Sequence, residues 1–354
     1  MVTYNGRELA LATLRSALES TGSIAVEWFV ADNGSTDGTA EAIERELPGV
    51  TVIRGDNLGF AHGNNVVLER ARGRYVLLLN PDIEIERGTL ASLVAELDER
   101  PDVGAASVIH RGTAGHVLPS IRRFPSPLRN LAEALFAPKL RALRGLQELD
   151  LELDTYFEER AADWVCGAFL IARREAIGDA GPLDERFFLY SEEVDWCLRI
   201  RAAGWEIRHL PVMEIVHHEG KPTPARVAEE CHSRVLYARK HFDRRAALAI
   251  HAALIVKHAL RLALVAAPAL LRPALRFRAR CEAHGLAVLV GAMEPPLSKA
   301  AREGAARAVS DRRDGVPVAA QVVPTAADDR VALRGHPFFP SVHESREPPR
   351  TFVR

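Results

Sequence analysis

Three carboxylates, Glu192, Glu193 and Asp195, stand within four positions directly after the aromatic run 187–190. Carboxylates held against apolar groups lose solvation, and their pKa rises toward the range in which a general base is useful. We therefore predict that Glu193 is a general base and that Glu192 and Asp195 orient it or bind an acceptor. An ordinary helix N-terminus also favours acidic residues, so this run alone does not identify a catalytic site.

Two further segments carry possible metal ligands. Asn80-Pro81-Asp82 follows the apolar run 76–79, and His217-His218 lies downstream. A carboxylate at a strand's end, here Asp82, can hold Mg²⁺ or Mn²⁺ against a nucleotide diphosphate, because phosphates complete the shell around one or two protein carboxylates. His217 could be a further ligand. In isolation, an Asn-Pro-Asp turn and a structural histidine pair are the simpler interpretations.

Three glycine- or aspartate-bearing turns could bind a nucleotide sugar. Asp32, in segment 30–39, could accept a hydrogen bond from the imide N–H of uracil or thymine, although helix capping by Ser35 and Asp37 explains this segment equally simply. Gly59, in segment 57–65, permits close backbone approach at a helix N-terminus that could face a diphosphate. Segment 164–170 reads as a buried strand, and its Gly167 could admit a sugar.

The elements that must position these residues alternate along the chain. Short branched or aromatic runs predict strands over 26–30, 50–53 and 75–79, and helical periodicity covers 7–18, 38–47 and 63–72. This alternation predicts an α/β fold with a largely parallel sheet and helices on both faces. Such sheets bind ligands at the carboxyl ends of their strands, where 32–38 and 80–82 fall. Because 2–6 reads as a strand end, the first strand either begins upstream of Met1 or is a stub, and we favour the upstream start.

Length and composition set the frame for this fold. A chain of 354 residues suits one domain of roughly 200–250 residues with an appendage. We divide it into a catalytic domain over 1–220, a basic amphipathic region over 221–294 and a tail over 295–354 that we expect to be disordered. The net charge of −1 gives no case for a nucleic acid partner. Four scattered cysteines and the polar N-terminal sequence indicate the reducing cytoplasm.

Segment 246–271 is rich in Ala, Leu, Ile and Val, but basic residues interrupt it. At ~100° per residue, His251, Lys257, His258 and Arg261 fall within a third of a turn of one another. A one-sided basic stripe on an apolar helix favours a membrane interface, and the arginines over 272–280 favour anionic headgroups. We therefore expect peripheral contact with an anionic membrane. The alternative is a helix packed on its own catalytic domain.

Taken in order along the chain, these segments resemble one family. They are Thr3-Tyr4-Asn5-Gly6, 32–39, 57–65, 79–82, 167–170, 188–195 and His217-His218. Together, over residues 1–220, they resemble the inverting family-two glycosyltransferases of GT-A fold, which have a Rossmann-like mixed sheet. Asn-Pro-Asp and Gly-Phe-Ala-x-Gly-Asn-Asn are most similar to the rhamnosyltransferase-like and galactofuranosyltransferase-like branch.

The resemblance implies a role for each matching residue. Asp82 would be the main metal ligand with His217, Glu193 would be the catalytic base, and Thr3, Tyr4 and Asp32 would contact a pyrimidine nucleotide. Two positions depart from the family pattern, since Asn80 stands where the first Asp of Asp-x-Asp is usual and Glu193 stands where Asp is usual. The full set of expected donor-binding residues is Thr3, Tyr4, Asn5, Asp32, Asn57, Gly59, Asn64, Asn80 and Gly167.

The same resemblance implies a substrate class. We expect a dTDP-rhamnose-like donor, a divalent cation (Mg²⁺ or Mn²⁺) and a lipid-linked or cell-envelope glycan acceptor at the cytoplasmic face of the membrane. One alternative is a non-catalytic nucleotide-sugar binding protein that has lost transferase activity. A second, a sugar nucleotidyltransferase, needs a Gly-rich phosphate loop with Lys or Arg near its N-terminus, and the sequence contains none.

Overall fold

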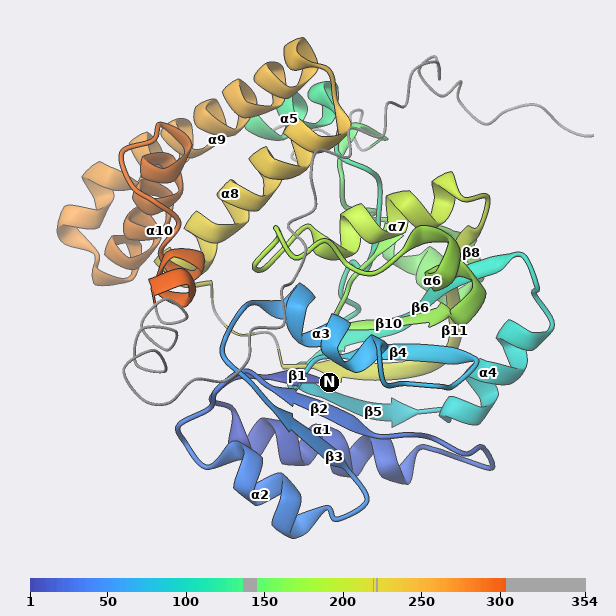
Figure 1. Cartoon of the computed structure of the whole chain (residues 1–354). Coiled ribbons are helices and arrows are strands. Elements are labelled where there is room, and N and C mark those ends of the chain that lie inside the picture. The colour runs from blue at the N-terminus through green and yellow to red at the C-terminus, as the bar shows by residue number, and fades with distance from the viewer. Residues whose placement is uncertain (136–144, 219, 221, 304–354) are drawn as a thin grey trace, which may run out of the picture. The chain divides into compact units, whose positions relative to one another are not determined.

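The computed structural model describes residues 1–135, 145–218, 220 and 222–303. Its first three strands form a parallel sheet in the order β1 (Val2–Thr3), β2 (Phe29–Asp32) and β3 (Thr51–Arg54), joined by α1 (Arg7–Glu19) and α2 (Thr39–Glu46) (Figure 1). The strand predicted over 26–30 begins later, at Phe29. β1 has two residues and pairs Val2 with Ala31. The expectation of an upstream start stays a prediction.

A second, mixed sheet forms the centre of the fold. Its order is β4 (Tyr75–Leu79), β10 (Phe169–Arg173), β6 (Val103–Gly112), β11 (Glu206–His217) and β5 (Ile83–Arg87), with β8 (Arg160–Ala161) on β11. β10 runs antiparallel to both neighbours, and β11 is parallel only to β6. The prediction of a largely parallel sheet is therefore wrong for this half. A central antiparallel strand covered on both faces has the same continuous apolar sequence as a parallel one.

Helices cover both faces of this sheet, as predicted (Figure 1). On one side Trp196 and Ile200 of α7 (Glu192–Ala202) pack with the sheet beside α6 (Arg174–Ala180). On the other side Leu93 and Leu97 of α4 (Leu90–Asp98) do so. The remaining elements before residue 220 are α3 (Phe60–Leu68), β7 (Ile121–Arg122), α5 (Pro127–Ala134), the 3₁₀ helix η3 (Leu153–Phe157) and β9 (Trp164–Val165).

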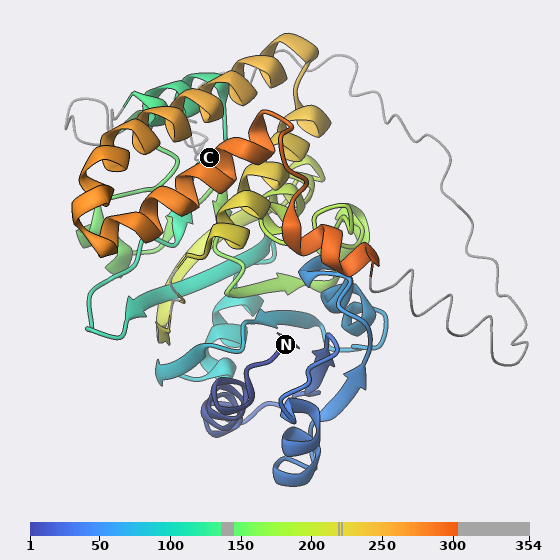
Figure 2. The ribbon, with the colours of Figure 1, turned by 90° about the vertical axis from the view of Figure 1, so that its left-hand side faces the viewer.

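Three helices follow the mixed sheet: α8 (Pro224–His241), α9 (Arg244–Leu271) and α10 (Pro273–Leu289) (Figure 2). The basic stripe of α9 faces neighbouring helices. His258 lies 2.7 Å from Glu282 of α10, and Lys257 lies 3.0 Å from Glu133 of α5. His251 contacts the carbonyl of Leu289. Three of the four basic residues of the stripe therefore have partners on neighbouring helices, as the alternative of a packed helix anticipates, and contact of this helix with a membrane stays a prediction.

The outward face of α9 is apolar. Its exposed large apolar side chains are Leu248, Val256, Leu260, Leu264, Leu270 and Leu271. By length and composition, α9 is also the one helix among the described residues that could cross a membrane. Its packing against α5, α8 and α10 is the arrangement that the alternative interpretation anticipated.

The first part of the tail that we predicted to be disordered is helical. Residues 296–303 are helical, and Ser298 donates hydrogen bonds from its backbone and its hydroxyl to Glu229 of α8. The prediction is wrong for this stretch, because the contact with α8 supplies the partner that the sequence pattern does not reveal. The rest of the predicted tail, 304–354, lies outside the described residues.

Candidate active site

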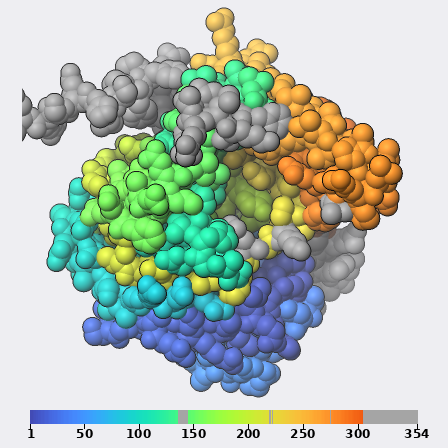
Figure 3. All heavy atoms as spheres, turned by 180° about the vertical axis from the view of Figure 1, so that it is seen from behind, coloured from blue at the N-terminus to red at the C-terminus, as the bar shows by residue number. Residues whose placement is uncertain are grey.

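A cleft of about 940 Å³ lies between the mixed sheet, the start of α7 and the C-terminal helices (Figure 3). It collects residues that are far apart in the sequence. The predicted site residues that line it are Thr3, Tyr4, Asn57, Gly59, Asn80, Asp82, Gly167, Glu192, Glu193 and His217. The sheet therefore brings the candidate base, the candidate metal ligands and most of the candidate donor-binding residues into one cavity.

Strand pairing builds the candidate metal corner. The antiparallel pairing of β11 with β5 sets His217 opposite Ile83, and the backbone N–H of His218 donates to the carbonyl of Asp82. This register places Nε2 of His217 3.5 Å from Oδ1 of Asp82. The N–H of Asn80 in turn donates to the carbonyl of Ala168.

The same corner has unsatisfied oxygens. Among the described residues, Oδ1 of Asn80 and Oδ1 of Asp82 are buried without a hydrogen-bond partner. Hard oxygen ligands of this kind suit Mg²⁺ or Mn²⁺ when donor phosphates complete the shell. No group of three His, Cys, Asp or Glu side chains in the described part of the chain could hold a metal by itself. The residues fit a cation that is shared with a diphosphate.

Backbone strain sets the position of the acidic pair. Tyr190 and Ser191 adopt left-handed φ angles of 69° and 67°, and α7 begins at the next residue. Non-glycine residues in this region cost about 1–3 kcal/mol each and persist where surrounding structure fixes them. A Cβ added at Gly167 would lie 3.2 Å from Cβ of Glu193. Gly167 therefore makes room for Glu193, whereas the sequence suggested that it makes room for a sugar.

Burial changes the acidity of the same pair. Oε2 of Glu192 and Oε2 of Glu193 are buried without a hydrogen-bond partner among the described residues. Desolvation raises the pKa of Glu193, and desolvation together with the neighbouring Glu193 charge raises the pKa of Glu192. The predicted effect of apolar surroundings on these carboxylates is confirmed.

Asp195 lies on another face of α7. Its side chain is 0% exposed, 2.9 Å from Arg199 and 2.7 Å from His241, and it also pairs with Lys240. Burial alone would raise the pKa of Asp195, but the His241 hydrogen bond and the Arg199 and Lys240 charges lower it. Asp195 does not line the cleft, which disfavours acceptor binding, whereas its predicted role in orienting the base stays a prediction. It anchors α7 to the end of α8.

Three predicted donor-binding residues also do not line the cleft. Asp32 accepts a hydrogen bond from the N–H of Ser35, and its other oxygen is buried without a partner among the described residues. Asn5 accepts from the N–H of Thr36. Asn64 donates to the carbonyl of Phe60 within its own helix. Short polar side chains bond to nearby backbone in this way at turns and helix starts.

The structure also differs from two expectations about the turns before α2 and α3: the close approach at Gly59 and the helix capping by Ser35 and Asp37. A Cβ at Gly59, whose φ is 104°, would lie 2.5 Å from the carbonyl oxygen of Phe188. The close approach at Gly59 is thus to the aromatic segment before the acidic pair. Helix α2 has Gly38 at its N-cap, with no side-chain cap bond. Asp37 instead accepts from the N–H of Thr39, and Ser35 bonds to the N–H of Asn5.

Several cleft residues were missed by sequence reasoning. Asn33 lies beside Asp32, and its side chain donates to the carbonyl of Gly59. Its place in the same polar turn was an available signal. Arg122 stands 5.0 Å over the Trp164 ring, and its Nε is buried without a partner among the described residues. Only the pairing of β7 with β9 brings these two together. The further lining residues include Asp56, Tyr190, Arg226, Leu297, Ala300 and Ala301.

Comparison with known proteins agrees with this geometry. Residues 1–153 match the model for glycosyl transferase family 2. An N-acetylglucosaminyl-diphospho-decaprenol L-rhamnosyltransferase of Mycobacterium tuberculosis is 32% identical over 231 residues, which cover 61% of this chain and 73% of that protein. The rhamnosyltransferase WbbL of Escherichia coli is 24% identical over 178 residues, covering 48% and 64%. A mannosyltransferase from Pyrobaculum calidifontis, solved with GDP-Man and Mn²⁺, shares the fold with a TM-score of 0.50 at 20% identity, covering 82% of this chain and 84% of that one.

Proposed function

This chain belongs to glycosyl transferase family 2, and from that premise we propose that it transfers rhamnose, or a similar sugar, from a pyrimidine nucleotide diphosphate to a lipid-linked or cell-envelope glycan. The observation that carries the proposal is the position of Glu193. It lies in the cleft against Gly167, with a raised pKa and an unpartnered buried oxygen among the described residues. A retained carboxylate of this kind argues against the non-catalytic alternative.

The proposed reaction has one displacement step. Glu193 removes the proton from an acceptor hydroxyl, and that oxygen attacks the anomeric carbon of the donor sugar. The bond from this carbon to the diphosphate oxygen breaks on the opposite side, so the configuration inverts and the nucleoside diphosphate leaves. We assign the nucleoside contact to Thr3, the last residue of β1, and to Tyr4, which follows it, because both line the cleft.

Charge on the leaving diphosphate needs compensation inside the cleft. Asp82, His217 and the side-chain oxygen Oδ1 of Asn80 would hold a divalent cation. When bound, the cation would act as a Lewis acid toward the leaving diphosphate. Arg122 and Arg226 also line the cleft and are free to face phosphate oxygens of either substrate.

The acceptor proposal rests on the outer face of the C-terminal helices. Leucines are exposed on α9, on α5 (Leu128 and Leu131) and at the C-cap of α5 (Leu135). Exposed Arg272 and Arg280 lie at and beyond the C-terminal end of α9. Apolar side chains flanked by arginines suit peripheral contact with an anionic bilayer at its cytoplasmic face. A lipid-linked acceptor would be met at such a surface.

Donor binding is the first test because it needs no acceptor. Calorimetric titration with dTDP-rhamnose, UDP-galactofuranose, UDP-glucose and GDP-mannose, first with Mg²⁺ or Mn²⁺ and then with EDTA, should show metal-dependent binding of one pyrimidine donor. Asp82→Ala should abolish the metal dependence, whereas the matched change Asp56→Ala, in the same cleft, should leave it. Failure of every donor to bind would refute the proposal, and binding without transfer to any glycan would favour the non-catalytic alternative.

A further inference from the structure

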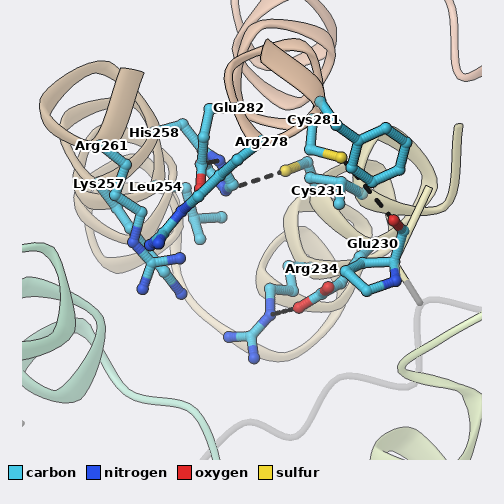
Figure 4. Close-up of a pocket in the computed structure, with 13 residues that line it drawn as sticks. Glu230, Cys231, Arg234, Leu254, Lys257, His258, Arg261, Arg278, Cys281 and Glu282 are labelled. Atoms are coloured by element: carbon cyan, nitrogen blue, oxygen red, sulfur yellow. Dashed lines mark hydrogen bonds and ion pairs between the residues drawn. The ribbon is translucent and has the colours of Figure 1, made fainter. Parts of the chain in front are cut away.

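A second pocket, of about 450 Å³, lies between α8, α9 and α10, and we call it the interhelical pocket (Figure 4). The catalytic step described above does not use it. Its ionisable lining is mostly basic, with Arg234, Lys257, His258, Arg261 and Arg278 facing Glu230 and Glu282, beside Cys231 and Cys281. A pocket of this size can enclose a small ligand group.

Both carboxylates of the interhelical pocket already have basic partners. Glu230 pairs with Arg234 at 3.2 Å, and Glu282 lies 2.7 Å from Nδ1 of His258. Arg234 also pairs with Glu148, which is not part of the lining. Each of these carboxylates therefore has a hydrogen-bond partner other than Arg261 and Arg278.

Two cations of the lining are unpaired. Lys257 has Glu133 at 3.0 Å, but Arg261 and Arg278 have no ion-pair or hydrogen-bond partner among the residues that the structure describes. The ends of Lys257, Arg261 and Arg278 point toward the same side of the pocket in Figure 4. Two free guanidinium groups from facing helices suit an anion with several oxygens, because each guanidinium can bind a phosphate through two parallel hydrogen bonds.

The surroundings of the interhelical pocket indicate which anion it takes. Glu230 and Arg234 line both this pocket and the catalytic cleft, so the two cavities are neighbours. On the other side Phe277, which is 45% exposed, lines the pocket, and exposed Leu264 follows Arg261 by one helical turn. An anion held here has a sugar-binding cleft on one side and an apolar surface on the other.

We propose that the interhelical pocket binds the diphosphate that joins the acceptor's sugar to its lipid. The inference rests on the proposed function and deepens it, since it assigns a separate subsite to the linkage of the acceptor. Arg261 and Arg278 hold the diphosphate oxygens, the lipid follows the apolar face of α9, and the sugar extends toward Glu193. The sugar is thereby positioned by a group outside the reacting centre.

The test uses the full chain and a short probe, farnesyl diphosphate, in detergent without divalent cations so that the metal-dependent donor site is not occupied. Binding is compared for wild type, Arg261→Gln, Arg278→Gln and their double variant. Losing a charge-assisted contact costs about tenfold in affinity, so the double variant should bind about 100-fold more weakly. Arg239→Gln makes the same charge change on α8 at an exposed residue outside the pocket and should bind within about threefold of wild type.

Other results would overturn the inference. Unchanged farnesyl diphosphate binding in the double variant would show that the two arginines hold no diphosphate. If inorganic pyrophosphate bound as tightly and as arginine-dependently as farnesyl diphosphate, the ligand would be a free phosphate and not a lipid-linked one. A double variant that lost only its binding to phosphatidylglycerol vesicles would identify a phospholipid headgroup as the ligand.

A transfer assay separates this inference from the proposed function. With a farnesyl-diphosphate-linked N-acetylglucosamine acceptor, the double variant should show a raised KM, while an octyl N-acetylglucosaminide without phosphate should be used as by wild type. Arginine-dependent farnesyl diphosphate binding with no sugar transfer by wild type would reject the proposed function and retain the pocket assignment. Equal loss with both acceptors would instead show a general structural effect and overturn the assignment.

Discussion

Replacement of Glu193 by Gln tests the catalytic assignment most directly. Gln preserves the volume that Gly167 accommodates, where Cβ of Glu193 lies 3.2 Å from an added Cβ, but it cannot accept a proton. General-base catalysis contributes about 10²–10⁴-fold, so kcat should fall by that factor, or about 3–5 kcal/mol of barrier. The substitution leaves the candidate nucleoside contacts Thr3 and Tyr4 and the candidate metal ligand Asp82 in place, so the donor Kd should change less than about threefold.

The pH profile gives a second, independent readout of the same change. Desolvation raises the pKa of Glu193, so wild-type kcat should fall as the pH drops through a value above the ordinary Glu pKa of about 4.3. Glu193→Gln should lose this acid limb. Glu192→Gln is the matched control, because the Glu193 pKa is raised mainly by desolvation and not by Glu192, so the acid limb and most of kcat should remain.

Initial rates with a saturating donor from pH 4 to 9, combined with donor calorimetry, measure both effects. Near-normal turnover by Glu193→Gln would refute the reasoning. An acid limb that persisted in Glu193→Gln but vanished in Glu192→Gln would move the base to the neighbouring residue.

Three further outcomes follow from the same contacts. The raised pKa of Glu192 makes its ionisation costly in the folded state, so Glu192→Gln should gain about 1–3 kcal/mol of unfolding free energy at pH 7. This gain should disappear below about pH 4, where the carboxyl is protonated in both the folded and the unfolded state. Urea unfolding at the two pH values measures the difference. Asp195→Asn should lose about 1–3 kcal/mol of unfolding free energy by removing the carboxylate that Arg199, Lys240 and His241 share, yet keep kcat per folded molecule; a large kcat loss with normal stability would return this residue to the chemistry. Leu264→Gln with Leu271→Gln should reduce sedimentation with anionic vesicles several-fold, whereas Leu9→Gln, an exposed leucine of α1, should not; equal effects would exclude α9 as the membrane face.

Local sequence patterns were sufficient to predict several elements and one electrostatic effect. Strand β4 has the predicted bounds Tyr75–Leu79, and α1 begins at Arg7 as expected. The acidic pair follows an aromatic run, which was enough to predict its desolvation. These features depend on neighbours within a few residues, so the order of residues along the chain contains the necessary information.

Other features depend on partners that are distant in sequence. On a helical wheel the basic stripe of α9 suggests a lipid-facing surface, but Glu133 and Glu282, from two other helices, turn it inward. Asp195 and Glu193 are two residues apart, yet Lys240 and His241 of α8 bury the first, while Gly167 leaves room for the second in the cleft. A periodic pattern shows that a helix has two faces, but only packing decides which face is covered.

The sequence by itself determined the fold class, the position of the acidic pair and which residues are the candidate metal ligands. Only the tertiary structure decided that Asn80, Asp82 and His217 meet, because that depends on the register of β11 against β5 and of β10 against β4. It also decided that Asn64 and Asn5 serve the backbone and do not line the cleft. The sequence pattern shows Arg261 and the arginines over 272–280 as basic stretches, but only the folded chain brings Arg261 and Arg278, on different helices, to one pocket.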